Sequence, residues 1–104
     1  MRADSPRITG PTLKVLKELM QRPSGGLSGA EIARATGLAS GTLYPLLFRL
    51  EKSAWLKSKW EDVSPSEVKR PRRRLYQVTA LGEAKTREAF KEFLPDLTEP
   101  LWQL

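Results

Sequence analysis

The sequence predicts one mainly helical domain that also contains a small antiparallel β-hairpin. In the first half of the chain, apolar residues recur at spacings of three and four, as on one face of a helix. In the second half, two segments alternate between apolar and polar residues, as in half-buried strands. A chain of 104 residues suffices for one such domain and is too short for two. We expect a flexible arm over residues 1–10, the folded domain over 11–94 and a short apolar tail over 95–104.

The first predicted helix covers residues 11–21. Leu13, Leu16 and Met20 recur at helical spacing, with charged residues between them. Pro11 suits the first turn, because an amide at that position would have no partner inside the helix.

Two further helices are predicted on either side of a tight bend. Ser28 and Glu31 have the spacing of a capping box, in which each side chain accepts a hydrogen bond from the backbone amide of the other residue. Gly37 can adopt the positive φ at which many helices end. The next helix is expected to start at residue 39 or 40 and to run to about 54. Its apolar stripe consists of Leu43, Leu46, Leu47 and Leu50. Two helices joined in this way are typical of a helix-turn-helix.

A long hairpin and a last helix complete the predicted domain. Residues 56–60 and 74–79 alternate as strands, and the polar segment 61–73 with its two prolines connects them. Thr79 is placed to cap a helix over 80–94. The apolar positions of that helix are Leu81, Ala84, Phe90, Phe93 and Leu94. A helix-turn-helix followed by such a hairpin predicts a winged helix-turn-helix.

The composition favours an acidic partner and argues against catalysis. Eighteen Lys and Arg outnumber twelve Asp and Glu, which gives a net charge of +6. The chain has no cysteine and no histidine, so it lacks thiolate ligands, the commonest metal ligand and the commonest general base. We therefore expect no enzyme, no metal and no cofactor. An apolar run near 18 residues is absent and residues 1–11 are polar, so we expect no membrane span and a cytoplasmic protein.

The second helix of a helix-turn-helix lies in the DNA major groove, and its N-terminal residues meet the base edges. The candidate residues on this helix are Ser40, Gly41, Thr42, Tyr44 and Arg49. The hydroxyls can donate to phosphates or bases, Gly41 permits close approach, and Arg49 can pair with a phosphate. The alternatives are that Ser40 and Thr42 only cap the helix and that Tyr44 belongs to the core. Pro45 removes an amide and is expected to loosen the helix locally.

The hairpin loop is the second candidate site. Residues 69–74 contain five cations, interrupted only by a proline. From Lys57 to Arg74 there are seven cations and three anions, so this segment supplies +4 of the net charge of +6. Such a run fits contacts to phosphates or to the minor groove, and the alternative is a solvated charged loop. The candidate residues are Lys69, Arg70, Arg72 and Arg73.

Three stretches of the chain resemble the PadR family of bacterial transcriptional regulators. They are GTLYPLLFRLE at residues 41–51, Trp60-Glu61, and RPRRRLYQVTALGEA at 70–84. The resemblance covers about residues 11–90. It implies a winged helix domain, a cytoplasmic location, repressor activity and a homodimer bound to an inverted repeat of double-stranded DNA. It also implies that the candidate residues of the helix and of the hairpin loop contact that DNA.

The C-terminal region departs from the family pattern. Family members usually continue into a long helical region that dimerises and helps to form an effector pocket, whereas here Pro95 ends the last helix. The expected dimer contacts are Phe90, Phe93, Leu94, Leu97, Leu101 and Trp102. These side chains can cover the first helix of the same chain or the same region of a partner chain, and we favour the partner. A small planar effector stacked on Trp102 is a further hypothesis.

Two other functions compete with specific regulation. A winged helix can serve as a protein-interaction module whose basic wing binds an acidic partner. The small polar residues at the start of the second helix argue against it, because they form no apolar groove. Nonspecific or RNA binding would need only the basic loop, but few exposed aromatic residues are available for stacking on unpaired bases. The operator, the regulated gene and any inducer cannot be read from the sequence.

Overall fold

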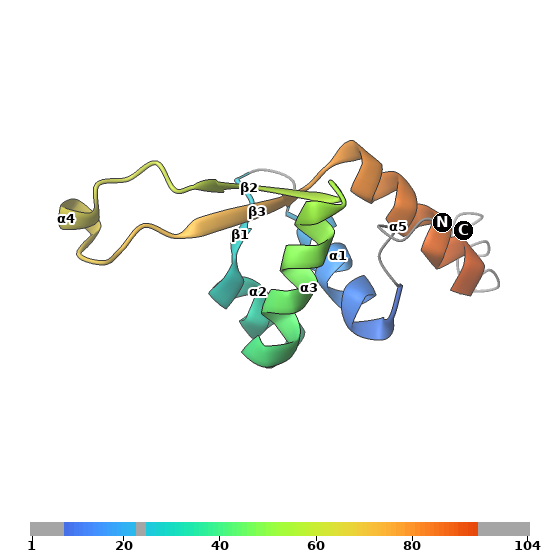
Figure 1. Ribbon diagram of the computed structural model, residues 1–104. Coiled ribbons are helices and arrows are strands. Elements are labelled where there is room, and N and C mark those ends of the chain that lie inside the picture. The colour runs from blue at the N-terminus through green and yellow to red at the C-terminus, as the bar shows by residue number, and fades with distance from the viewer. Residues whose placement is uncertain (1–7, 23–24, 94–104) are drawn as a thin grey trace, which may run out of the picture.

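Helices and short strands alternate along the chain in the computed structural model, which describes residues 8–22 and 25–93. In chain order the elements are α1 (Gly10–Met20), β1 (Leu27–Ser28), α2 (Gly29–Thr36), α3 (Ser40–Lys52), β2 (Leu56–Trp60), α4 (Pro65–Val68), β3 (Arg74–Val78) and α5 (Ala80–Phe93). The first three helices lie together against one end of the sheet, and the β2–β3 hairpin extends far beyond them (Figure 1). This arrangement is a winged helix-turn-helix, as predicted.

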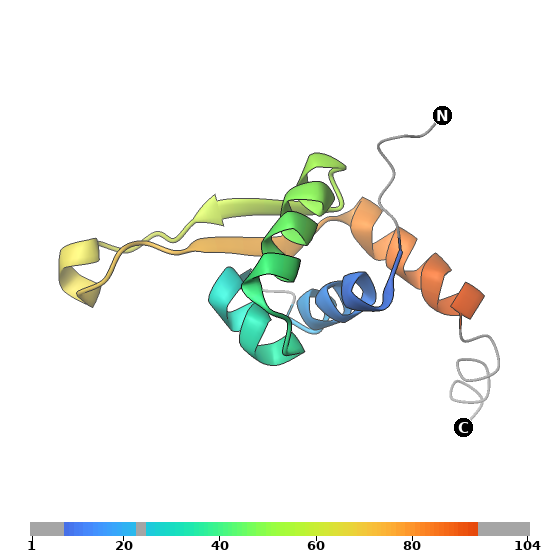
Figure 2. The same ribbon diagram turned by 60° about the horizontal axis from the view of Figure 1, so that its bottom comes forward.

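The sheet has three antiparallel strands in the order β1-β3-β2. Leu56 pairs with Val78 at the base of the hairpin, and Trp60 pairs with Arg74 at its outer end. The wing is the hairpin and its loop, residues 56–78. It carries α4 at its tip, far from the helices (Figure 2). The predicted hairpin is confirmed, but β1 was missed because it has only two residues and leads straight into α2.

The apolar core lies between α1, α2, α3 and the base of the sheet. All four residues of the predicted leucine stripe of α3 are buried. In α1 the buried apolar positions are Val15, Leu16 and Leu19, whereas Leu13 and Met20 are only half-buried. Of the three predicted positions only Leu16 is buried, so the predicted phase of α1 was only partly right. Because α1 contacts α2, β3 and α5, its buried face is set by neighbours that its own sequence does not reveal.

The predicted helix caps are present. Ser28 and Glu31 form the capping box, with distances of 2.9 Å from the Ser28 amide to the Glu31 carboxylate and 3.2 Å from the Glu31 amide to the Ser28 hydroxyl. Gly37 ends α2 with φ of 75°. Thr79 accepts from the Gly82 amide at 3.0 Å and so caps α5.

The folded region begins earlier than predicted. Thr9 is the N-cap of α1, and Ile8 packs against the core cluster. These residues therefore belong to the domain and not to the expected arm, while residues 1–7 lie outside the described part of the chain.

The inner face of α5 also differs from the prediction. Leu81 is 45% exposed and Ala84 is exposed, whereas Gly82, Thr86 and Ala89 face inward. A Cβ atom at Gly82 would collide with the Trp55 carbonyl, so the helix backbone packs directly on the chain that follows α3. Trp55 itself is buried in the core. The close approach at Gly82 turns Leu81 outward, which periodicity alone could not show.

Candidate nucleic-acid interface

The start of α3 presents unpaired polar groups to solvent. Ala39 is the N-cap and makes no side-chain capping bond, so Ser40 is the first helical residue. Within residues 8–22 and 25–93, the hydroxyls of Ser40 and Thr42 have no hydrogen-bond partner. The proposal that these residues only cap the helix was therefore wrong, and both hydroxyls remain able to bind a ligand.

Tyr44 packs over the start of α2 and stays accessible. Its side chain is 46% exposed, which excludes the alternative that it belongs only to the core. A Cβ atom at Gly29 would lie 2.8 Å from two carbons of the Tyr44 ring, so the glycine makes room for the tyrosine. Gly41, Pro45 and Arg49 are exposed on the same helix. Helix α3 continues through Pro45 to Lys52.

A notch separates α3 from the wing. It encloses about 210 Å³. Its lining residues come from β1, the start of α2, α3 and the edge of β3, and they are Ser28, Gly29, Ala30, Tyr44, Arg73, Arg74 and Tyr76. Two arginines and two tyrosines thus line the notch, at the point where both elements of the predicted site converge. Burial raises the pKa of Tyr76 further above neutrality, so the phenol keeps its proton at neutral pH, as an ordinary tyrosine does.

Arg70 is held inside the wing. Its two terminal nitrogens donate to the two carboxylate oxygens of Glu61 at 2.7 and 3.0 Å. Glu61 also accepts from the Arg73 amide at 3.1 Å, and its own amide donates to the Arg73 carbonyl at 2.8 Å. This bidentate pair joins the two chain segments of the wing just beyond the ends of β2 and β3.

The other wing cations are more accessible. Lys69 is exposed and ends α4 with a left-handed φ of 60°. Arg72 is exposed and donates through Nε to the Val63 carbonyl at 2.9 Å, which leaves its terminal nitrogens without a partner in the described part of the chain. The side chain of Arg73 is 44% exposed, and its guanidinium lies 4.0 Å from Glu31. One wing cation, Arg70, is therefore engaged within the wing, whereas Lys69, Arg72 and Arg73 remain accessible to a ligand.

The helix α4 at the wing tip was not predicted. Ser64 is its N-cap and Pro65 stands in its first turn. The spacing of Ser64 and Glu67 matches a capping box, and Pro65 matches the first helical position, so a local signal was present. The prolines of this segment were instead interpreted as marks of a loop.

A polar cluster fixes the wing to the end of α3. Arg74 donates through Nε to the Ser58 hydroxyl at 2.9 Å, lies 3.6 Å from Glu51 and stacks 5.3 Å from the centre of the Trp60 ring. The Ser58 hydroxyl in turn donates to Glu51. Trp60 thus stacks on Arg74 at the outer end of β2. The role of Arg74 was missed, because its partners are distant in the sequence.

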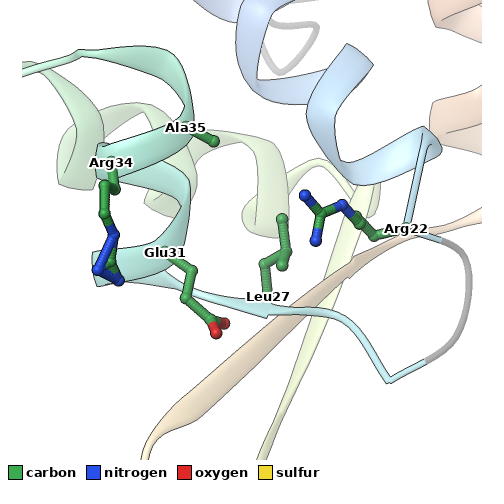
Figure 3. A pocket seen from close by; sticks show the side chains of 5 residues that line it. All are labelled: Arg22, Leu27, Glu31, Arg34 and Ala35. Carbon is green, nitrogen blue, oxygen red and sulfur yellow. The ribbon is translucent and has the colours of Figure 1, made fainter.

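A second hollow lies on the outer side of α2. It encloses about 300 Å³ and is lined by Arg22, Leu27, Glu31, Arg34 and Ala35. Figure 3 shows the Arg22 guanidinium and the Glu31 carboxylate on either side of Leu27. Because Glu31 is already engaged by the capping box and opposes the two arginines, this hollow indicates no single class of ligand. Among the described residues, no group of three acidic side chains is placed to hold a metal ion.

The predicted dimer contacts are only partly described. Phe90 is half-buried on α5, and Phe93 is the last residue of that helix. Leu94, Leu97, Leu101 and Trp102 lie outside the described residues. No described helix has the length and apolar character needed to cross a membrane.

The Arg70–Glu61 pair makes the wing sensitive to acid. The Arg70 guanidinium lowers the pKa of Glu61 from 4.5 to about 2, and the Arg73 amide adds to this effect. Because the folded state has the lower pKa, the pair stabilises the fold above pH 4.5, and this contribution disappears as the pH falls towards 2. Carboxyl-carbon NMR should show the Glu61 midpoint near 2, and Arg70→Ala should return it towards 4.5. A midpoint near 4.5 in the unmodified protein would show that the pair does not form in solution.

Comparisons with known proteins agree with this architecture. The chain is 23% identical to a PadR-like transcription factor from Bacteroides fragilis, with a TM-score of 0.66 over 88% of this chain and 86% of that one. It is 22% identical to Staphylococcus aureus MepR in a DNA complex, with a TM-score of 0.67 over 92% of this chain and 72% of that one. AbfR of Staphylococcus epidermidis gives 23% identity and a TM-score of 0.67 over 90% of this chain and 58% of that one.

At these identities the solved structures establish the fold. No curated protein matches the chain. The sequence model of the transcriptional regulator PadR-like family matches residues 15–88, which is most of the chain. The protein therefore belongs to the PadR-like family of transcriptional regulators.

Proposed function

We propose that the protein binds specific double-stranded DNA sites as a homodimer and represses transcription there. The observation that carries this proposal is the notch between α3 and the wing. There Tyr44 of α3 and the arginines Arg73 and Arg74 of the wing line a single concave surface. A convex duplex, with its major groove beside a phosphate backbone, offers the shape and charge that fit this surface.

The site residues divide into three roles in this proposal. Ser40, Gly41, Thr42 and Tyr44 lie at the major groove, and Arg49 pairs with a phosphate on its border. Lys69, Arg72 and Arg73 contact the backbone from the wing. Arg70 is a positioning residue, because its guanidinium is occupied by Glu61 and holds the wing in shape.

Homodimerisation and repression complete the proposal. Two copies related by a two-fold axis would match an inverted-repeat operator, with half-sites one helical turn or a multiple of it apart. Phe90 and Leu81 place apolar surface on α5, at the opposite end of the molecule from the wing tip (Figure 1). A contact there would leave both DNA-facing surfaces free. The DNA-complex neighbour, MepR, supports the mode of binding by analogy of fold.

Fluorescence anisotropy tests the proposal. The DNA upstream of the gene for this protein is compared with a shuffled duplex at physiological salt. A preference of about 10³ or more is expected for specific recognition. Equal weak binding to both duplexes would contradict specific recognition of that region, and absence of binding to either would favour a protein-interaction module.

Tyr44→Ala is expected to reduce the preference for the cognate duplex. The half-exposed phenol lies at the notch, where it can donate to a base edge or pack on a sugar. We expect cognate affinity to fall about tenfold, within the range that one good base contact provides, while affinity for shuffled DNA changes little. Tyr44→Phe, which keeps the ring over Gly29, separates the hydroxyl from the packing contact. An equal loss on both duplexes would instead assign Tyr44 to backbone positioning.

A further inference from the structure

The outward face of α3 carries an exposed phenylalanine that the fold does not use. Phe48 is 65% exposed, more than any other exposed large apolar residue of the described part. The core cluster of the described residues is built from the opposite, leucine-bearing side of the helix. Lys52 holds its ammonium group 5.7 Å from the centre of the Phe48 ring. A single exposed apolar side chain is ordinary on a protein surface, so exposure alone indicates no function. The position of Phe48 on the helix is what bears on its role.

Helical geometry puts Phe48 at the centre of the surface that enters the groove. Successive residues turn by about 100° around a helix, so the side opposite the leucines carries Gly41, Pro45, Phe48 and Lys52. Gly41 and Pro45 are both exposed and offer no long side chain. A Cβ atom at Gly41 would meet nothing within 4 Å, so the fold does not require glycine there. The small residues let the helix approach a groove closely, and Phe48 then projects from the same line two turns from the start.

The surroundings of Phe48 fit nucleic acid better than an apolar protein partner. Thr42 and Arg49 flank this line on one side and Ser40 and Tyr44 on the other, so hydroxyls and a cation border a small apolar centre. Lys52 at the end of the line can reach a phosphate while its stem covers the ring. In the major groove the only apolar group on a base edge is the C5-methyl group of thymine, and phenylalanine is one of the side chains that contact it.

We propose that Phe48 reads the methyl group of a thymine in each half-site of the DNA. This inference rests on the proposed DNA-binding function and adds one specificity-determining contact to it. The contact is apolar and short-ranged, so it discriminates thymine from cytosine at one position and is insensitive to salt. Lys52 restricts the ring to the outward face and adds a phosphate contact beside it.

The test begins with selection of a preferred duplex from a random library by the full-length protein. Each thymine of the selected duplex is then replaced singly by deoxyuridine, which lacks only the methyl group. At one thymine position in each half-site, a single replacement should weaken wild-type binding about fourfold. This is the value expected when one apolar carbon group is no longer buried. Phe48→Ala should bind the parent duplex more weakly and should lose the difference between thymine and deoxyuridine at that position.

Two further variants make the result specific. Phe48→Leu keeps an apolar side chain and should retain part of the deoxyuridine penalty. Val68→Ala removes an exposed apolar side chain from α4 and should retain all of this penalty. Because Phe48 lies outside the core, circular dichroism and thermal melting should show that Phe48→Ala is folded.

The outcomes separate this inference from the proposed function. A selected duplex without any methyl-dependent thymine, or a penalty that persists in Phe48→Ala, would overturn the inference alone. Failure to enrich any sequence would overturn both specific DNA recognition and the role of Phe48.

Discussion

Replacing Arg72 and Arg73 together by alanine is expected to weaken binding to all duplexes about 30-fold for each protomer, and so about 10³-fold for the homodimer, at 150 mM salt. Each phosphate contact adds about 0.9 to the slope of log affinity against log salt, which amounts to about fivefold for each cation at this salt concentration. The terminal nitrogens of Arg72 have no partner in the described ranges, and Arg73 lies at the edge of the notch. The loss should be similar for cognate and shuffled DNA, because phosphates carry no direct sequence information.

The salt dependence is the most direct measurement of this effect. A dimer whose side chains neutralise six to ten phosphates loses about 10³–10⁵ in affinity between 50 and 200 mM salt. The double variant should flatten the slope by about one unit for each phosphate that it no longer neutralises. Lys85→Ala with Lys91→Ala is the matched control, since it removes two exposed cations from α5. Unchanged affinity in the wing variant, or an equal loss in the control, would show that net charge and not the wing governs binding.

Gly82→Ala is expected to lower the free energy of unfolding by about 1–3 kcal/mol, although alanine is the better helix former. The added methyl group would collide with the Trp55 carbonyl, and it would lie 2.8 Å from a methyl carbon of Val78 and 3.0 Å from the Trp55 carbonyl carbon. Backbone atoms cannot rotate away as a flexible side chain can. The α5 helix must therefore shift, and the Thr79 hydrogen bonds to the carbonyls of Ala54 and Trp55 must shift with it.

Gly41→Ala is the matched control for this substitution. Gly41 also lies in a helix, but its Cβ position is open, so alanine should raise the free energy of unfolding by up to about 1 kcal/mol. Urea denaturation followed by circular dichroism measures both variants. The control should weaken DNA binding if α3 approaches the groove as proposed. Equal stability of Gly82→Ala and the wild type would mean that α5 does not pack on Trp55 as described.

The sequence predicted those parts of the fold that local patterns determine. The leucine stripe of α3, the capping box of α2, the end at Gly37 and the β2–β3 hairpin each depend on residues close together in the chain. The phases of α1 and α5 depend instead on contacts between distant segments, such as that of Gly82 with Trp55. Strand β1 exists only because β3 lies beside it, so no pattern of two residues could reveal it.

The candidate site was predictable in location but not in the assignment of each charge. The basic run marked the wing, yet charge alone could not separate Arg70, which Glu61 engages, from Arg72, whose ends remain open. Phe48 had a usable signal, since it stands opposite the leucine stripe. The prediction of DNA-contacting residues rested on the polar residues at the start of the helix. The exposed aromatic residue two turns later was not considered.

The cluster of Arg74, Ser58, Glu51 and Trp60 has a consequence for the choice of DNA. It fixes the distance between the end of α3 and the wing, because each group is held by at least one other. When the recognition helix sits in the major groove, the height at which the wing meets the neighbouring backbone is then also fixed. A duplex whose groove width differs from this spacing must bend or twist to fit, at an energy that depends on its base steps. The protein is therefore expected to discriminate between sequences at base pairs that no side chain touches.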